Sequence, residues 1–350
     1  MRVLVTGGCG FIGANFLAAS RARWPNWEFL NVDALTYAAA SPPGRASGEA
    51  GAEPFRQLDL CDATEVAELV REFQPQLVVH FAAETHVDRS IYDPRSCLRT
   101  NVEGTVNLLE SCRQLAVPPT FHLVSTDEVY GPCGDVAFDE GASYHPSSPY
   151  AASKAAANHW THAYHRTYGL DVRITNGANT YGPRQFPEKL VPLVILRLLK
   201  DEPLPIYGSG LQVRDWLYVD DHCEAIWSVI ERGRTGQTYN VASGARVTNL
   251  ELVRRLCELV AHALGVDPES KLALIHHVAD RPGHDAAYHV DATRVSSECG
   301  WRPKVELLHG LKRTVNWYLS HTDWLERAIG GDYEHWLQRN YRGRGGYSCG

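Results

Sequence analysis

The stretch Val3-Leu-Val-Thr-Gly-Gly-Cys-Gly-Phe-Ile-Gly13 decides the fold of this 350-residue chain. Its first four residues are apolar or β-branched, which is typical of a buried strand. The glycines at positions 7, 10 and 13 follow directly and open a helical pattern. Glycine lets the backbone come close to a pyrophosphate, and the N–H groups of the helix N-terminus can receive it. Gly7, Gly10 and Gly13 therefore predict a dinucleotide site, with a plain structural turn as the alternative.

Asp33 strengthens this interpretation. It stands at the end of the second predicted strand, 20 residues after Gly13. A carboxylate at this place accepts hydrogen bonds from the adenosine ribose and repels a 2′-phosphate, which favours NAD over NADP.

Short apolar segments alternate with helical patterns through the first half of the chain, and this rhythm predicts a parallel sheet with crossover helices. Strands are expected at Val3–Thr6, Glu28–Val32, Phe55–Leu58, Leu77–Phe81, Thr120–Ser125 and Asp171–Thr175, and helices at Phe11–Arg23, Ala63–Phe73, Ser96–Leu115 and Tyr150–Tyr168. The predicted fold class is α/β, a Rossmann-type doubly wound parallel sheet followed by a smaller mixed α/β C-terminal lobe that binds substrate.

The pattern changes after about residue 181, where prolines at 183, 187, 192, 203 and 205 divide the chain into shorter pieces. Helices are expected there at Leu190–Lys200, Val219–Arg232, Asn249–Leu264 and Leu307–Leu319. We expect an NAD-binding domain at 1–180 with a returning segment near 219–245, a smaller second lobe at 181–330 and a C-terminal tail at 331–350. The stretch Ala38–Pro54, rich in Ala, Gly, Ser and Pro, predicts a mobile surface loop.

Composition excludes several classes of function. The net charge is −7 and the basic residues are scattered, which argues against binding to nucleic acid or to a membrane surface. The longest apolar run, Leu190–Leu199, is too short to span a bilayer and contains Pro192 and Arg197. Nine cysteines without a C-x-x-C spacing argue against a disulfide framework and a zinc knuckle, so a cytoplasmic protein without a signal peptide is expected.

The histidines at 159, 162 and 165 do not change the expectation of no metal site. Residues spaced three and six apart fan around a helix, and no Cys or carboxylate repeats with them.

The reactive residues are expected in His122-Leu-Val-Ser-Thr-Asp-Glu-Val-Tyr-Gly131 and in Tyr150-x-x-x-Lys154. Tyr150 and Lys154 lie four residues apart on one predicted helix face, where an ammonium can lower the pKa of a phenol. A phenol pKa of about 10 must fall by about 3 units for Tyr150 to act as a base near neutral pH.

Asp127 and Glu128 follow the end of a predicted strand. Two carboxyl groups held in different environments can act as an acid and a base, and such a pair can eliminate water from a sugar. A solvated turn is the alternative for a pair of this kind on its own. Two further candidates for the cofactor site are less specific: Asp59 after the third strand, and the small residues of Phe81-Ala82-Ala83 after the fourth.

Taken together, the motifs resemble those of the dTDP-glucose 4,6-dehydratases, a group within the extended short-chain dehydrogenase/reductase family. The resemblance covers nearly the whole chain and includes Asn31-Val-Asp-Ala-Leu-Thr-Tyr37, Glu84-Thr-His-Val-Asp-Arg-Ser-Ile91, Thr100-Asn101, Ser148-Pro-Tyr-Ala-Ala-Ser-Lys154, Gln185-Phe-Pro-Glu-Lys-Leu190, Arg214-Asp-Trp-Leu-Tyr218 and Asp280-Arg-Pro-Gly-His284.

The resemblance implies a lyase that keeps NAD tightly bound and regenerates it in each turnover. Tyr150, aided by Thr126 and Lys154, would take the proton of the C4 hydroxyl; Glu128 would remove the C5 proton, and Asp127 would protonate the departing C6 oxygen. The resemblance also implies a homodimer that packs helices such as Ser96–Leu115 and Tyr150–Tyr168 across a two-fold axis.

The same resemblance implies two sets of binding residues. The NAD set is Gly7, Gly10, Phe11, Ile12, Gly13, Asp33, Ala34, Leu35, Thr36, Asp59, Leu60, Phe81, Ala82, Ala83, Thr100, Tyr150, Lys154 and Thr180. The nucleotide-sugar set is Thr85, Thr126, Asn179, Lys189, Leu190, Pro205, Ile206, Tyr207, Arg214, Asn249, Asp280, Arg281, Pro282, Gly283 and His284. Arg214 and Arg281 suit a diphosphate, with a surface salt bridge as the alternative for each.

Two positions depart from the family pattern. Asn179-Thr180 stands where the family usually has two asparagines, and Tyr239-Asn-Val-Ala-Ser243 replaces the common Tyr-Asn-Ile-Gly-Gly. Both concern cofactor affinity and loop geometry more than the type of reaction.

Several functions remain as alternatives. They are a 4,6-dehydratase or 4-epimerase for a UDP- or CDP-hexose, a UDP-glucuronate decarboxylase, and a noncatalytic NAD-binding sensor. Asp127 argues against the epimerase and the decarboxylase, which do not expel a C6 hydroxyl.

Overall fold

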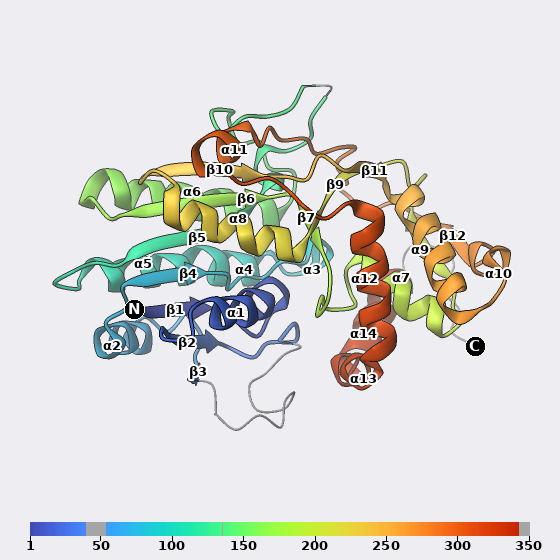
Figure 1. Cartoon of the computed structure of the whole chain (residues 1–350), viewed down its shortest axis with the longest axis horizontal. Coiled ribbons are helices and arrows are strands. Elements are labelled where there is room, and N and C mark those ends of the chain that lie inside the picture. Colours follow the sequence, from blue (N-terminus) through green and yellow to red (C-terminus); the bar gives the residue numbers. More distant parts are fainter. Residues whose placement is uncertain (40–53, 135, 343–350) are drawn as a thin grey trace.

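A parallel sheet of seven strands forms the centre of the larger part of the molecule, in the order β10-β6-β5-β4-β1-β2-β3 (Figure 1). The computed structural model describes residues 1–39, 54–134 and 136–342. The strands are β1 (Arg2–Thr6), β2 (Glu28–Asp33), β3 (Phe55–Gln57), β4 (Leu77–His80), β5 (Thr120–Thr126), β6 (Val172–Gly177) and β10 (Gln237–Val241). The order reverses direction at β1, as in doubly wound nucleotide-binding folds, so the predicted fold class is confirmed.

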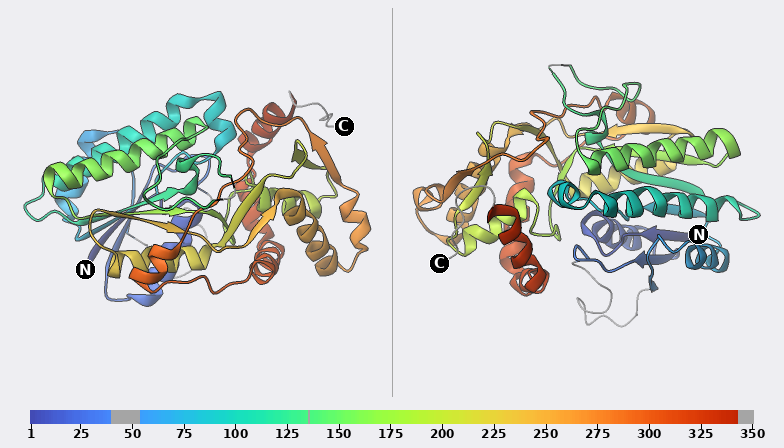
Figure 2. Two further views of the ribbon diagram at one scale, coloured as in Figure 1. Left: turned by 90° about the horizontal axis from the view of Figure 1, so that it is seen from above. Right: turned by 180° about the vertical axis from the view of Figure 1, so that it is seen from behind.

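Helices cover both faces of this sheet (Figure 2). On one face lie α2 (Ala63–Phe73), α5 (Gly104–Arg113) and α6 (Pro149–Tyr168), whose apolar residues form one core with the strands. The other face is covered by α1 (Phe11–Arg23) and α8 (Val219–Arg232), and α11 (Thr293–Cys299) packs beside α8. Strands covered on both faces explain the continuous apolar runs in the sequence.

The predicted helix Ser96–Leu115 is observed as three consecutive segments. They are α4 (Pro94–Cys97), the π-helical turn η1 (Leu98–Glu103) and α5. Widened turns of this kind are frequent at functional sites, and η1 carries Thr100. The short helix α3 (Val87–Tyr92) precedes them.

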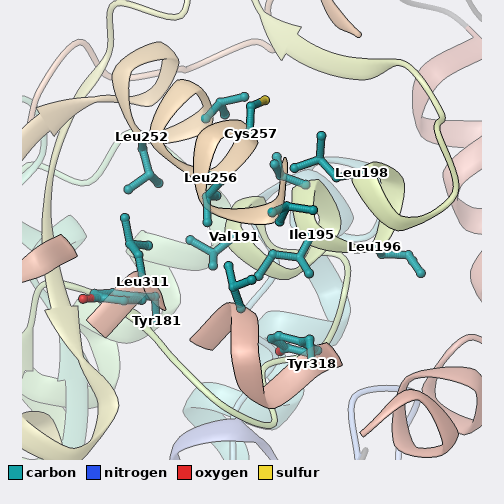
Figure 3. Packing of buried hydrophobic residues seen from close by; sticks show 14 of the residues in the cluster. Tyr181, Val191, Ile195, Leu196, Leu198, Leu252, Leu256, Cys257, Leu311 and Tyr318 are labelled. Carbon is teal, nitrogen blue, oxygen red and sulfur yellow. The ribbon is translucent and has the colours of Figure 1, made fainter. Parts of the chain in front are cut away.

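The second lobe contains two small sheets, β11-β9-β7 and β12-β8. Their strands are β7 (Asn179–Tyr181), β8 (Leu204–Tyr207), β9 (Val213–Tyr218), β11 (Arg246–Thr248) and β12 (Ile275–Val278). The helices are α7 (Leu190–Leu199), α9 (Asn249–Leu264), α10 (Pro268–Leu272) and α12 (Leu307–Ser320). A buried apolar core joins α7, α9 and α12, as the packing of Ile195, Leu256 and Leu311 in Figure 3 shows.

Two helices end the described chain, α13 (Thr322–Ala328) and α14 (Gly331–Arg342). The expected tail at 331–350 is thus helical in the part that the structure describes, and Tyr333, Trp336 and Tyr341 are buried. Burial of three aromatic rings explains why this segment is ordered against the body. Residues 40–53 of the expected loop lie outside the described residues.

None of the helices in the described ranges is both long enough and apolar enough to cross a membrane.

Candidate active site

The carboxyl ends of the parallel strands meet at one edge of the sheet, and a cavity lies there. Gly7 follows β1, Asp33 ends β2, Phe81 follows β4 and Gly177 ends β6, and all four line the cavity. This is the crevice where open α/β sheets bind ligands.

The turn after β1 is shaped for close backbone approach. Gly7 has φ +72°, and a Cβ placed on it would come within 2.5 Å of the backbone nitrogen of Ala82. A Cβ on Gly13 would collide with the carbonyl oxygen of Gly7. Glycine is therefore required at both positions. Phe11, Ile12 and Gly13, the first residues of α1, line the cavity, where the N–H groups of a helix N-terminus suit a pyrophosphate.

Asp33 is fixed by backbone groups. The N–H of Cys9 donates to its Oδ2 and the N–H of Leu35 to its Oδ1, each at 2.9 Å. Burial raises the pKa of Asp33, and these two hydrogen bonds oppose that shift. The oriented carboxylate suits two ribose hydroxyls.

Most of the predicted cofactor residues reach the cavity wall. They are Gly7, Gly10, Phe11, Ile12, Gly13, Asp33, Ala34, Thr36, Phe81, Ala82, Ala83, Thr100, Tyr150, Lys154 and Thr180. Leu35, Asp59 and Leu60 are not part of the wall. Asp59 accepts from the N–H of Cys61 in the turn before α2, and the Leu60 side chain is buried in the core of the sheet.

Thr126, the last residue of β5, caps the turn that follows the strand. Thr126 accepts from the N–H of Glu128 at 3.2 Å and opens the 3₁₀ turn η2 (Asp127–Tyr130). Because of this turn, the side chains of Asp127 and Glu128 point in different directions. Glu128 lines the cavity, whereas Asp127 lies behind the cavity wall and is 2% exposed.

The environment of Asp127 favours its protonated form. Burial raises its pKa well above the ordinary value of 3.8, and the charges of Glu128 and Asp215 raise it further. Arg214 and the Thr126 hydroxyl oppose the shift. Its Oδ2 has no hydrogen-bond partner among the described residues, which fits a carboxyl group that holds a proton.

Helix α6 places Tyr150 and Lys154 on the cavity. Ser148 caps the helix by accepting from the N–H of Ala151 at 3.1 Å, and Pro149 occupies its first turn. The Lys154 ammonium donates to the carbonyl oxygen of Val124 at 2.8 Å.

The pKa of Tyr150 differs from the expectation. Burial raises it above the ordinary value of 10.0, and the charge of Glu128 adds to the increase, while a hydrogen bond with Thr126 lowers it. Burial also lowers the pKa of Lys154 to about 8. The protein side chains around Tyr150 thus favour its neutral phenol. Lys154 does not offset the effect of burial, because its ammonium is hydrogen-bonded to a backbone carbonyl of β5.

The predicted substrate residues divide between the cavity and the second lobe. Besides Thr126, the wall contains Thr85, Asn179 and Lys189, and the Lys189 ammonium donates to the carbonyl oxygen of Thr85 at 2.6 Å. The others are not in the cavity wall: Leu190, Pro205, Ile206, Tyr207, Arg214, Asn249, Asp280, Arg281, Pro282, Gly283 and His284.

The two predicted diphosphate arginines both act on His284. Burial lowers the pKa of His284, and the charges of Arg281 and Arg214 lower it further. Arg214 is 4% exposed and donates to the carbonyl oxygen of Asp285 at 2.9 Å. Burial excludes the surface salt bridge that was the alternative for Arg214.

Three titratable residues of the cavity wall were not predicted as site residues: His222, Glu84 and Glu188. The His222 Nδ1 lies 2.8 Å from the hydroxyl of Thr180, and burial lowers its pKa to about 4. The two glutamates stand inside the quoted motifs, but nothing in those motifs distinguishes a buried carboxylate from a surface one.

Among the residues that the structure describes, no group of three or more His, Cys, Asp or Glu side chains could hold a metal ion.

Comparison with known proteins agrees with this geometry. The family model described as GDP-mannose 4,6 dehydratase matches residues 4–314. A dTDP-glucose 4,6-dehydratase of Xanthomonas campestris is 47% identical over 341 residues, which cover 94% of this chain and 96% of the relative. One of Shigella flexneri is 43% identical over 364 residues, covering 98% of this chain and 100% of the relative.

Solved structures are similar as well. DesIV, a dTDP-glucose 4,6-dehydratase of Streptomyces venezuelae with NAD bound, is 42% identical, with a TM-score of 0.84 over 94% of this chain and 100% of that chain. A UDP-glucose 4-epimerase of Thermus thermophilus in complex with NAD is 34% identical, with a TM-score of 0.81 over 92% of this chain and 100% of that chain. The chain therefore belongs to the dTDP-glucose 4,6-dehydratase family, within the extended short-chain dehydrogenases/reductases.

Proposed function

We propose that this protein is an NAD-dependent lyase that converts dTDP-glucose to dTDP-4-keto-6-deoxyglucose. The observation that carries the proposal is the pair at the end of β5: Asp127 is buried with a raised pKa, and Glu128 beside it lines the cavity. A proton donor and an acceptor next to one another are what an elimination of water requires.

NAD fits the cavity in two respects. The N-terminus of α1 lines the cavity after a glycine turn in which a Cβ would not fit, and Asp33 is oriented for a ribose. When bound, NAD would accept a hydride from C4 of the sugar and return it to C6.

The first step is oxidation at C4. Tyr150 accepts the proton of the C4 hydroxyl. Burial raises its pKa, and the positive charge of Lys154, together with that of the oxidised nicotinamide when NAD is bound, would stabilise the phenolate. Thr126, hydrogen-bonded to Tyr150, stabilises the same charge.

The second step is elimination across C5 and C6. The C4 ketone acidifies the C5–H bond, Glu128 takes that proton, and Asp127 gives its proton to the C6 oxygen, which leaves as water. With the hydride restored to C6 by the bound cofactor, Glu128 would return its proton to C5. The C4 ketone stays in the product, so Tyr150 keeps the C4 hydroxyl proton while Asp127 has lost its own. Loss of the Tyr150 proton and uptake of one proton by Asp127, both by exchange with solvent, restore the starting state.

We assign residues 1–180, with the segment near 219–245, to cofactor binding and 181–330 to the nucleotide sugar. Parallel pairing of β10 with β6 supports the first assignment. Arg214 donates to the carbonyl oxygen of Asp285, four residues after Arg281 in the chain, which supports a diphosphate site in the second lobe. Thr180 meets His222, which gives a hydroxyl–imidazole pair where relatives usually have an asparagine.

We further propose a homodimer that works in the cytoplasm on a small-molecule substrate and binds neither nucleic acid nor membranes. Exposed Leu98 on η1 and Trp160 on α6 support an interface on the helices that the sequence analysis expected there. The cysteine usage of the chain, without a C-x-x-C spacing, supports the cytoplasmic location.

Incubation of the pure protein with dTDP-glucose carrying deuterium at C4 tests the function. The expected product is a 4-keto-6-deoxy sugar whose C6 methyl group contains the deuterium, detected by NMR. A product that keeps an oxygen at C6, as an epimerase would form, contradicts the proposal. UDP-glucose and CDP-glucose in parallel reactions measure the base preference.

A further inference from the structure

Helix α14 lies beside the cavity and contacts its supporting residues with one face. Tyr333, Trp336 and Asn340 are spaced three and four residues apart, so they share a side of the helix. The Tyr333 hydroxyl donates to the carbonyl oxygen of Pro187 at 2.8 Å, and the Asn340 amide donates to the Tyr207 hydroxyl at 2.8 Å. These two hydrogen bonds fix the helix and place Trp336 between them.

Trp336 forms one side of a three-layer stack. The Arg89 guanidinium carbon lies 4.3 Å from the centroid of the Trp336 ring and 3.6 Å from that of Tyr37. The Nε of Arg89 donates to Oε2 of Glu188 at 2.8 Å, and Glu188 is buried and lines the cavity. A guanidinium between two rings and paired with a carboxylate is held in one orientation.

Tyr37 connects this stack to the cofactor end of the cavity. It belongs to the loop 34–39 that follows Asp33, and Ala34, Thr36, Ala38 and Ala39 of that loop line the cavity. The Tyr37 hydroxyl is hydrogen-bonded to the carboxylates of Glu84 and Glu188. The position of the loop therefore depends on Arg89, and through it on Trp336.

We infer that Trp336 is a positioning residue for the cofactor, which acts through Arg89 and Tyr37 to hold the loop 34–39 against bound NAD and to slow NAD release. The inference rests on the proposed function, in which NAD is regenerated at every turnover and need not leave. The C-terminal helix is then a structural part of the cofactor site.

Retention of NAD by the full-length protein tests the inference. The protein is loaded with NAD and transferred to NAD-free buffer, and the nucleotide that remains bound is measured over time. Trp336→Ala should release NAD about tenfold faster than the wild type, since a partly buried cation–π contact of this kind is worth about one power of ten. Trp336→Phe keeps a ring and should restore most of the retention.

The other side of the stack provides an independent variant. Tyr37→Leu leaves α14 unchanged and should accelerate release similarly, and combining it with Trp336→Ala should add little because both break the same stack. Glu334→Ala, on the exposed side of α14, is the matched control and should release NAD like the wild type. Turnover at saturating NAD should stay within about twofold in Trp336→Ala, since its role is positioning.

Two outcomes overturn the inference alone: wild-type release rates in Tyr37→Leu, or wild-type release rates in Trp336→Ala with an unchanged melting temperature. A wild-type protein that binds no NAD overturns the proposed function and the inference with it.

Discussion

Asp127 and Glu128 are neighbours in sequence, yet their surroundings differ. Asp127 is sealed behind the wall, where burial and the charges of Glu128 and Asp215 raise its pKa, and Glu128 lines the cavity. The sequence could place both residues after a strand. It could not predict which one would be buried, because Asp215 and Arg214 come from β9, far along the chain.

Replacing Asp127 by Asn tests its role as the acid that protonates the C6 oxygen. The amide fits the same space but cannot deliver a proton, so C4 oxidation should continue while elimination stalls. We expect product formation to fall by roughly 10²–10⁴-fold, the usual contribution of a general acid. The absorbance of reduced nicotinamide should rise and persist after dTDP-glucose is added. Product formation at the wild-type rate would show that Asp127 is not the acid. The control is Asp220→Asn, which changes an exposed carboxylate paired with Arg313 and should leave product formation unchanged.

Lys154 should make stability depend on pH. Its pKa is about 8 in the folded protein against an ordinary value of 10.5, because burial disfavours the ammonium. Below pH 8 both states hold the proton. Between pH 8 and 10.5 only the unfolded state does, so this residue's contribution to the free energy of unfolding increases with pH, by up to about 3 kcal/mol.

Urea unfolding of the wild type and of Lys154→Met at pH 7 and pH 10 measures this contribution. The difference between the two proteins should shift in favour of the wild type as the pH rises, because Met has no proton to lose. A difference that is equal at both pH values would contradict the lowered pKa of Lys154.

At the scale of elements, the first six strands of the large sheet and the long helices of both parts were predictable, including α7, α9 and α12 of the second lobe, whereas the strands of the second lobe were not. The six predicted strands are observed with ends within two residues of the prediction, since buried parallel strands carry clear apolar runs. Strands β7, β8, β9, β11 and β12 were missed, and so was β10 of the large sheet. They are three to six residues long, and β8 contains Pro205, so neither length nor periodicity separates them from loops.

The cap of α6 should couple helix stability to catalysis. Ser148→Ala removes the acceptor for the N–H of Ala151 and should cost about 1 kcal/mol of stability. It should also lower turnover, because Tyr150 and Lys154 lie in the first two turns. Asp62→Ala removes an equivalent cap from α2, which contributes no cavity residue, and should cost similar stability without lowering turnover. Equal turnover in the two variants would show that the α6 cap has no catalytic effect.

At the scale of the whole molecule, the site joins residues from distant parts of the chain. The family resemblance predicted most residues of the cavity wall, because the motifs that follow successive strands meet at one edge of the sheet. The stack of Tyr37, Arg89 and Trp336 was not predicted, because a tail pattern after residue 330 gives no indication of which surface it will cover. Contacts between segments this far apart depend on tertiary packing, which local sequence patterns do not encode.

The proposed dimer can be tested on the outer face of η1, α5 and α6. Leu98, Val102 and Val106 recur every four residues along η1 and α5, and Ala152, Ala156 and Trp160 recur likewise on α6; Leu98 is 59% exposed and Trp160 45%. Both η1 and α5 contact α6, so we expect the two rows to lie side by side as one apolar strip in which alanines permit close approach.

Arginine in this strip should separate the subunits, because pairing across a two-fold axis would bring each new charge into a desolvated interface. Light scattering of the wild type should give twice the mass of one chain, and Ala156→Arg should give the mass of one. Val117→Arg, at a position 80% exposed in the loop after α5, should remain dimeric. A wild-type protein that is monomeric at micromolar concentration, or an Ala156→Arg variant that stays dimeric, would contradict this interface. Since α6 carries Tyr150 and Lys154 on its inner side, the monomer should also turn over more slowly than the Val117→Arg control.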